Sequence, residues 1–250
     1  MKLRVRPGLP TRPSYSHYKQ TEPLPMHFKL RTSFSSLLAG LLIAIFTSSP
    51  AFAQAVGLAC GSLDNHYGPF DYRKANKQQL SLVENFHFTP QIENLIKGRD
   101  NPFANDISYT LRVFPNHPRA LITIQRLAER EKTDFPAHAE WSVACYFERA
   151  IRFRPDDYIV RMLFASYLIK KTRFNEATQQ LDETIRLAGD DPFTNFNVGL
   201  VFLDMNNYER ALAQAHRAAA LGFTRTGLKD RLVAAGKWVE PPAPVDAQKP

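Results

Sequence analysis

The 250-residue sequence predicts an all-α fold built from repeated helix pairs, and two observations lead to that prediction. The first is an internal repeat of 34 residues, a period typical of stacked helix–turn–helix units. Residues of similar size recur at this interval: Ala165 and Gly199, Phe174 and Tyr208, Ala177 and Ala211, Thr184 and Ala218, and Leu187 and Leu221. The second is a bulky–small–bulky stripe at helical period, formed by Phe164, Ala165 and Leu168 and again by Val198, Gly199 and Phe202.

Short side chains at matched positions predict where the two helices of each pair cross. Ala165 and Gly199 belong to the first helix of a unit, and Ala177 and Ala211 belong to the second. Only a short side chain lets two helix backbones approach closely. The aromatic residue at each turn is expected to cap the wedge between the two helices.

This pattern resembles that of tetratricopeptide repeat proteins, and the resemblance covers residues 115–223. It implies a solenoid of about three helix–turn–helix units. The first unit is irregular, because its leading helix is expected over residues 118–131 and residues 132–136 lengthen the turn that follows. Its second helix is indicated by Phe147, Ala150, Ile151 and Phe153, followed by Pro155, which align with Leu181, Thr184, Ile185 and Leu187 of the next unit.

Residues 224–238 are expected to form a helix that caps the last unit. Leu228, Leu232 and Ala235 would make its apolar face, Gly236 would stop it, and Trp238 would pack nearby. Residues 239–250 form a proline-rich polar tail that can neither continue a helix nor bury a face. We therefore expect this tail to be disordered.

The N-terminal residues 1–53 have the order of a secretory signal peptide preceded by an upstream segment. Lys29 and Arg31 come before an apolar run over residues 34–46, and small residues then lead to a cleavage site after Ala53. Met26 is the expected true start. The run is shorter than the roughly 20 residues that span a bilayer, so a permanent membrane helix is the weaker alternative. These features predict export to a bacterial periplasm, with no membrane association after cleavage.

Removal of residues 1–53 also changes the meaning of the charge. The whole chain has a formal net charge of +8, but residues 1–53 hold seven basic residues and one acidic residue. The remainder keeps 25 basic and 23 acidic residues, a net charge of about +2. No basic helix or aromatic-interleaved basic run remains in it, so nucleic acid is not an expected partner.

The two cysteines, Cys60 and Cys145, form the only possible disulfide pair in the chain. An oxidising compartment would permit the bridge, which would staple the N-terminal segment to the second helix of the irregular unit. Closure of so long a loop contributes on the order of 4 kcal/mol in the chain-entropy model. Two alternatives stay open: a pair of free thiols, and lipidation of Cys60, whose preceding residues match a lipoprotein cleavage box poorly.

Residues 54–114 are expected to dock on the repeat. Residues 60–114 do not follow it, and about 55 turn-rich residues are too few to bury a core of their own. Short helices are expected near residues 91–97 and 107–114, the first one entered through Thr89 and Pro90. The expected aromatic anchors are Phe70, Tyr72, Phe86, Phe88, Phe103, Tyr109 and Phe114. The segment resembles that of exported bacterial tetratricopeptide proteins with a similar Asn-His-Tyr-Gly-Pro stretch, a group without a clear activity.

An acid/base or metal site is the main alternative use of this segment. His66, Asp71, Arg73 and His87 are the residue types that such a site employs. The simpler interpretation is that Gly68 and Pro69 form a turn, that Asp71 and Arg73 pair or cap, and that the histidines pack beside aromatic rings. No nucleophile elbow, phosphate loop or metal-spaced Cys/His cluster occurs, so we predict no catalytic residue, metal, cofactor or small-molecule substrate.

The resemblance implies that a peptide or protein partner binds in a concave groove lined by the first helix of each unit. By repeat position the groove residues would be Ile159, Met162, Ser166, Ile169, Lys170, Phe193, Phe196, Asn197, Leu200 and Asp204. This set is mainly apolar, so we expect hydrophobic peptide anchors. The alternative is a structural protein whose groove is filled by its own aromatic N-terminal segment. The function predicted is a non-catalytic interaction or assembly module of the bacterial cell envelope.

Overall fold

The computed structural model describes residues 60–98 and 102–241, and the regular secondary structure of these residues is entirely helical. The predicted all-α class is therefore confirmed. The chain divides into two units, Met1–Thr47 and Ser48–Pro250, and all the described helices belong to the second. The predicted signal peptide, its cleavage site and most of the proline-rich tail lie outside the described residues.

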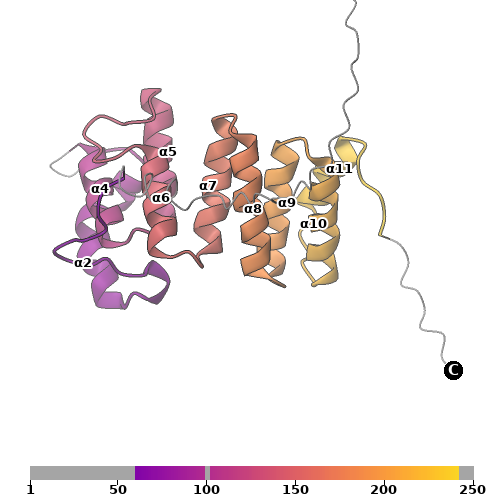
Figure 1. Cartoon of the computed structure of the whole chain (residues 1–250), viewed down its shortest axis with the longest axis horizontal. Helices are drawn as coiled ribbons and strands as arrows, with labels where there is room; N and C mark the ends of the chain where they lie inside the picture. The colour runs from indigo at the N-terminus through magenta and orange to yellow at the C-terminus, as the bar shows by residue number, and fades with distance from the viewer. Residues whose placement is uncertain (1–59, 99–101, 242–250) are drawn as a thin grey trace, which may run out of the picture. The chain divides into compact units, whose positions relative to one another are not determined.

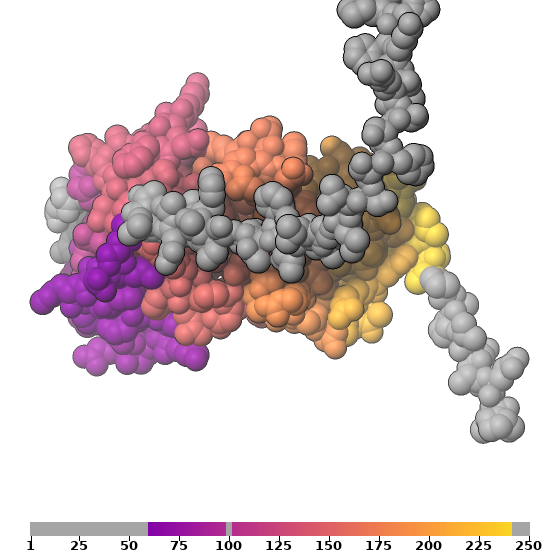
Figure 2. All heavy atoms as spheres, in the orientation of Figure 1, coloured from indigo at the N-terminus to yellow at the C-terminus, as the bar shows by residue number. Residues whose placement is uncertain are grey.

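The helices follow one another along the chain with short connections, and Figure 1 shows α5 to α11 side by side in chain order. Figure 2 shows the same helices in contact as successive bands of side chains. Their bounds are η1 (Tyr72–Lys74), α2 (Lys77–His87), α3 (Pro90–Glu93), α4 (Phe103–Val113), α5 (Pro118–Glu131), α6 (Val143–Phe153), α7 (Tyr158–Lys170), α8 (Phe174–Ala188), α9 (Pro192–Asp204), α10 (Tyr208–Ala220) and α11 (Gly227–Ala234). No helix in the described part of the chain is long and apolar enough to cross a membrane.

Two helix pairs, α7–α8 and α9–α10, repeat each other in geometry as well as in sequence. α7 and α9 begin 34 residues apart, each capped by a carboxylate, from Asp157 and Asp191 respectively. Thr172 and Asn206 sit at equivalent places in the two turns, and both have a φ of 58°. The residue after each of them donates its backbone N–H to the carbonyl five residues earlier, at 2.9 Å in both turns. The 34-residue period thus sets caps, turns and helix bounds together.

Small side chains mark the closest helix approaches, as the sequence predicts. Ala177 and Ala211 are fully buried between the helices of their pairs. At Gly199 an added Cβ would lie 2.3 Å from a methyl carbon of Leu228 and 3.2 Å from the Cβ of Gln214. The backbone of α9 therefore approaches both α10 and α11 at a point where only glycine fits without displacement.

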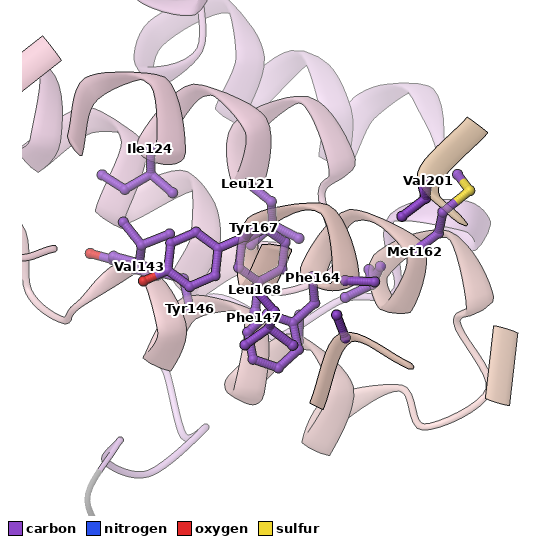
Figure 3. Close-up of a cluster of buried hydrophobic side chains, with 14 of the residues drawn as sticks. Leu121, Ile124, Val143, Tyr146, Phe147, Met162, Phe164, Tyr167, Leu168 and Val201 are labelled. Atoms are coloured by element: carbon purple, nitrogen blue, oxygen red, sulfur yellow. The ribbon is translucent and has the colours of Figure 1, made fainter. Parts of the chain in front are cut away.

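The main core runs between the helix pairs, and Figure 3 shows its central part. Phe147 of α6 stacks on Phe164 of α7, with ring centroids 5.2 Å apart, and Leu168 and Leu181 are fully buried beside them. α5 adds Leu121 and other apolar side chains of its inner face to the same cluster. Each Å² of apolar surface removed from water contributes about 25 cal/mol to stability, so this continuous cluster is the main source of stability in the stack.

The first pair, α5–α6, is irregular in the way that the sequence predicts. α5 spans Pro118–Glu131, the predicted range, with proline in its first turn and His117 as N-cap. The connection from Lys132 to Ser142 is much longer than the turns of the regular pairs, and α6 contains Phe147, Ala150, Ile151 and Phe153 as predicted. Lys132 closes α5 in the left-handed conformation, with a φ of 55°.

The N-terminal segment forms helices that extend the stack, with α2 and α3 packed on α4 and with α3 and α4 packed on α5. Thr89 caps α3 and Pro90 begins it, as predicted, but α3 ends at Glu93 and α4 starts at Phe103, earlier than expected. α2 was not predicted. The signal that could have revealed it is a capping box in which Asn76 and Gln79 bond reciprocally to each other's backbone N–H.

Six of the seven predicted aromatic anchors pack inside this N-terminal region. Phe70, Tyr72 and Tyr109 surround the buried Phe114, while Phe88 is buried in the main cluster and Phe103 packs against its edge. Phe86 is the exception, because 46% of it is exposed on α2. Phe86 is therefore not a buried anchor, although Val83, three residues before it on α2, is buried.

α11 has the predicted capping position after α10, with two of the three predicted apolar residues inside. Leu228 and Leu232 are buried against α9 and α10. Ala235 is exposed because α11 ends at Ala234, which corrects its predicted place on the apolar face. Gly236 follows with a φ of 66°, and Trp238 packs edge-on to His216 with ring centroids 5.0 Å apart. The predicted stop and the predicted place of Trp238 are both confirmed.

Candidate binding face

The ten residues predicted to line a groove lie along one side of α7 and one side of α9 at helical spacing, and we call this surface the first-helix face. It comprises Ile159, Met162, Ser166, Ile169 and Lys170 of α7 and Phe193, Phe196, Asn197, Leu200 and Asp204 of α9. Phe193 is 49% exposed, and Ile159, Ile169, Phe196 and Leu200 are half-buried. The face is therefore apolar and open to solvent at several points.

Three of the ten residues hold helices together. Met162 is only 9% exposed, and Figure 3 shows it beside Val201 of α9, so that it belongs to the contact between α7 and α9. Lys170 pairs with Glu129 of α5 at 2.7 Å, and Asp204 pairs with Arg231 of α11 at 2.7 Å. The two charges on this face are thus neutralised by residues of neighbouring helices, α5 and α11, and most of its remaining side chains are apolar.

Two hollows flank the first-helix face. One, of about 110 Å³, lies beside Phe196, whose ring is tilted against that of Phe223 with centroids 4.7 Å apart, and it is completed by Leu228 and Trp238. The other, of about 370 Å³, lies between α5 and α7 at Ala128, Glu129, Tyr167, Lys170 and Lys171, with Gln125 at its edge. Burial raises the pKa of Tyr167 to about 12, so its phenol stays protonated as a hydrogen-bond donor.

Sequence reasoning missed several residues that line these hollows. Phe223 and Trp238 follow helices, and their place in the hollow beside Phe196 depends on the way α11 folds back on α9. Gln125 and Ala128 belong to α5, whose alignment to the 34-residue repeat is shifted by the long connection after it. The extra residues in that connection could have indicated the shift, whereas nothing in the sequence placed Phe223.

The residues of the predicted alternative catalytic or metal site do not come together as one site. Asp71 and Arg73 form an ion pair at 2.8 Å, as the simpler interpretation predicts, and Asp71 also caps η1. His87 contacts Asp106 instead, at 3.0 Å, with its ring 4.1 Å from that of Tyr109. His66 is exposed in a bend.

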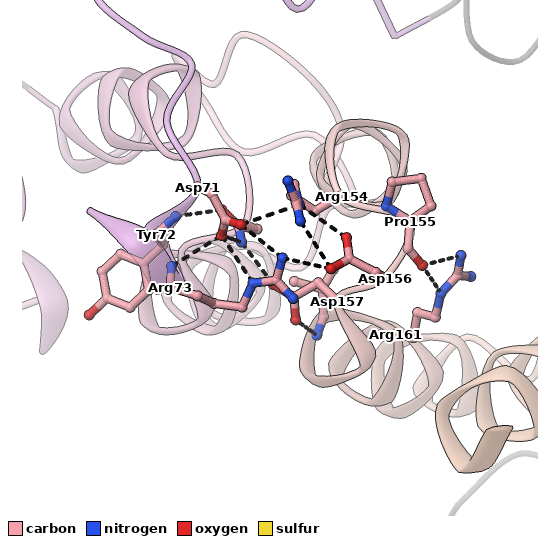
Figure 4. Close-up of polar contacts among 10 residues, drawn as sticks. Asp71, Tyr72, Arg73, Arg154, Pro155, Asp156, Asp157 and Arg161 are labelled. Atoms are coloured by element: carbon pink, nitrogen blue, oxygen red, sulfur yellow. Dashed lines mark hydrogen bonds and ion pairs between the residues drawn. The ribbon is translucent and has the colours of Figure 1, made fainter. Parts of the chain in front are cut away.

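Asp71 and Arg73 belong to a polar cluster that ties η1 to the connection before α7 (Figure 4). Arg73 reaches Asp156 at 3.0 Å, and Arg154 reaches Asp71 at 3.2 Å. Hydrogen bonds from Arg73, the largest influence, and from Asn116 hold the pKa of Asp71 well below its usual range. The side-chain bond from Arg154 lowers the pKa of Asp156 to about 2. The carboxylates of Asp71, Asp156 and Asp157 at this joint thus each pair with an arginine of the same cluster.

A buried amide completes this joint. Asn116 is 1% exposed, and its NH₂ group donates to Asp71 at 2.7 Å and to Asp157 at 2.8 Å. Its carbonyl oxygen accepts from the backbone N–H of Tyr72 at 2.9 Å. Since Asp157 is also the N-cap of α7, the amide connects the N-terminal segment directly to the start of the regular repeats.

Cys60 and Cys145 form a disulfide, with an S–S distance of 2.05 Å. The predicted staple between the N-terminal segment and α6 is therefore present. Arg149 of α6 reinforces it by donating to the carbonyls of Cys60 at 2.8 Å and Ser62 at 2.6 Å, while its guanidinium lies 3.6 Å from the ring centroid of Trp141.

No protein-family model matches the chain, and no curated protein matches it either.

Proposed function

We propose that this chain is a tetratricopeptide-type repeat protein that binds a peptide or protein partner on the first-helix face, without catalytic activity of its own. The observation that carries the proposal is the geometric repeat of α7–α8 in α9–α10, where the caps and bounds of the first helices, the turns and the starts of the second helices recur after 34 residues. Helix pairs stacked at such a period present their first helices side by side as an extended surface for a partner.

The chemistry of the face supports an apolar ligand. Phe193 is half-exposed, and Phe196 and Leu200 follow it at helical spacing along α9. Lys170 and Asp204 already have partners on adjacent helices, so a charged ligand would have to displace an ion pair. We infer that the partner presents apolar side chains on a helical or extended segment.

The N-terminal segment is the other occupant considered for this face. Six of its seven aromatic anchors pack beside α5 or within α2–α4, and the principal helix contacts of α2, α3 and α4 are with one another and with α5. Their aromatic side chains are thus committed at the N-terminal end of the stack. This arrangement supports an outside partner over self-occupation.

We further propose that the protein works in an oxidising compartment, the periplasm of a Gram-negative bacterium. The Cys60–Cys145 disulfide supports this location, since such bridges persist in secreted and periplasmic proteins and are rare in the cytosol. The proposed role is accordingly that of an interaction or assembly module of the cell envelope.

A binding experiment with two matched phenylalanine substitutions tests the proposed face. Short random peptides displayed on phage are selected on the immobilised full chain, and the affinities of the selected peptides are measured by fluorescence anisotropy. Phe193→Asp alters the first-helix face, whereas Phe174→Asp alters a phenylalanine of nearly equal exposure, 47% against 49%, at the start of α8.

We expect Phe193→Asp to weaken binding about tenfold or more and Phe174→Asp to leave it unchanged, because a lost apolar anchor costs more than about 1 kcal/mol. Circular dichroism verifies that both variants keep their helices. Equal loss of binding in the two variants, or selected peptides that are indifferent to both, would overturn the proposal.

A further inference from the structure

A carboxyl group lies against the disulfide. Oε2 of Glu148 is 3.2 Å from Sγ of Cys60, and the two sulfurs and a Glu148 carboxylate oxygen all lie within 4.8 Å of one another. A disulfide sulfur has no proton to donate, so a contact this short is favourable when the carboxyl carries the proton. Burial raises the pKa of Glu148, and this effect exceeds the opposing effects of Arg173 and Arg152.

The two sulfurs differ in their surroundings. Cys60 is 2% exposed and lies beside Glu148, whereas Cys145 is half-buried and stands in the first turn of α6, where its N–H bonds to Oγ of Ser142. An incoming thiol therefore has better access to Cys145. The positive end of a helix also stabilises a thiolate at such a position.

The segment that carries Cys60 is held in place independently of the disulfide. Arg149 donates to the carbonyls of Cys60 and Ser62, and Arg152 donates to the carbonyl of Gly61 at 2.6 Å. Trp141 packs against Gly61, where an added Cβ would lie 3.2 Å from its indole nitrogen. These contacts would keep the two thiols close after reduction, so that re-formation of the bond is an intramolecular step.

The geometry points to Cys60, Cys145 and Glu148 as a redox-active site that exchanges electrons with dithiols, in which Glu148 supplies the proton to the leaving Cys60 sulfur. A thiolate of the dithiol attacks Sγ of Cys145. The S–S bond breaks, Cys60 leaves with the electron pair, and it takes the proton from Glu148, which remains as a carboxylate.

The second thiolate of the reductant then attacks the reductant's own sulfur in the mixed disulfide. Cys145 leaves as a thiolate at the start of α6, and the reductant departs as a disulfide. The protein has gained two electrons and the dithiol has lost two, and Glu148 regains its proton from water. The reverse sequence reduces a partner disulfide to a dithiol and re-forms the Cys60–Cys145 bond, with Glu148 as the base that accepts the proton of Cys60.

The charged groups that face Glu148 define the pH response. Arg152 lies on the same helix, and Arg173 and Glu176 lie at the start of α8, where they pair with each other at 2.6 Å. This pairing leaves burial as the dominant influence on Glu148. Glu148 should therefore accelerate reduction of the disulfide most at low pH, where its carboxyl is protonated, and less as the carboxyl ionises.

Reduction of the disulfide by dithiothreitol is the test, on the full chain without denaturant. Rates are measured between pH 5.5 and 8.5 by maleimide trapping and are expressed per thiolate of the reductant. We expect Glu148→Gln to be slower than wild type by about tenfold or more at the acid end, with the gap narrowing as pH rises. Glu140→Gln, which changes a carboxylate paired with Arg112, should match wild type.

Two results would overturn the assignment. One is equal rates for Glu148→Gln and wild type at every pH. The other is reduction at the rate of global unfolding, seen as equal acceleration of all variants by mild urea, which would make the disulfide a structural staple alone. A monothiol trap identifies the attacked sulfur by mass spectrometry. We expect the adduct on Cys145, and an adduct on Cys60 would also contradict the proposed step.

Discussion

The regular pairs α7–α10 and the N-terminal region from Cys60 to α6 share one helical stack but are held together by different means. In the regular pairs, residues at fixed intervals of 34 supply the caps, the turns and the buried apolar contacts. In the N-terminal region, singular contacts do this work: the disulfide, the buried amide of Asn116 and the capping imidazole of His117. A periodic core can therefore be extended by a non-periodic one when polar and covalent contacts fix the junction.

The largest expected effect on stability comes from a change in the N-terminal region alone. Replacing both cysteines, as C60S/C145S, removes a cross-link that spans 85 residues and should lower the free energy of unfolding by about 4.5 kcal/mol in the chain-entropy model. Urea unfolding followed by circular dichroism measures the loss. Hydrogen exchange should accelerate more in α2–α5 than in α9–α10, because stacked units can open separately. Equal acceleration of hydrogen exchange in both regions would show that the disulfide does not stabilise the N-terminal region separately from the regular pairs.

A core truncation in the regular pairs should come next. Leu181 of α8 is fully buried, and Leu181→Ala should cost about 3 kcal/mol through lost burial and a residual cavity. Leu82→Ala is the matched control, because Leu82 is half-exposed on α2 and should lose less than about 0.5 kcal/mol. Chemical denaturation compares the two. A similar loss in both would show that burial does not distinguish these regions.

The polar joint provides a smaller effect. Asn116→Ala leaves the carboxylates of Asp71 and Asp157 without their shared donor, and we expect a loss of about 2 kcal/mol. Asp190→Asn, which weakens an exposed pair with Arg217, should cost less than about 1 kcal/mol. Thermal unfolding of the two variants side by side is the measurement, and an Asn116 effect as small as that of Asp190 would mean that the joint adds little.

The smallest effect is a pH dependence located at His117. This side chain is fully buried, accepts the N–H of Ala120 at Nδ1 and contacts Glu84 at Nε2, 3.1 Å away. Burial, the largest influence, lowers its pKa below the usual value of about 6.5. The unfolded chain then binds the proton more readily, so stability is complete above about pH 6.5 and falls below it, by at most about 1.4 kcal/mol per pH unit.

Urea midpoints at several pH values between 5.5 and 7.5 test this sign. His117→Asn keeps a side-chain cap for α5 but cannot titrate, so the difference between variant and wild type isolates the histidine. Glu84 does not change charge in this pH range, because its bond to His117 is the main influence that lowers its pKa. A difference that does not vary with pH would refute the assignment.

The sequence predicted those features that depend on spacing or on local caps. The bounds of α5, the start of α3 at Thr89 and Pro90, and the close helix approach at Gly199 all follow from local residue types. The capping box that starts α2 was present but was overlooked. Contacts between distant segments, such as that of Asn116 with Asp157, depend on how non-repeating helices dock, and no period specifies that.

The candidate site divides in the same way. Helical spacing placed its ten residues on α7 and α9, but burial of Met162 against α9 depends on the distance between two helices, which spacing does not give. The engagement of Lys170 and Asp204 depends on the partners opposite them, Glu129 and Arg231. For the disulfide, counting sufficed to identify the pair, while the position of Glu148 beside it required the structure.

The disulfide also has a mechanical consequence for a protein attached at both ends. If tension were applied between the segment before Cys60 and the C-terminus, the covalent bond would carry the force directly into α6. The helices α2 to α5 would bear no tension, because they lie inside the loop that the disulfide closes. The 85 residues of this loop, roughly 290 Å when fully extended, could not be stretched while the bond is intact. The repeats from α7 onward would yield first, and only reduction of the bond would release the hidden length.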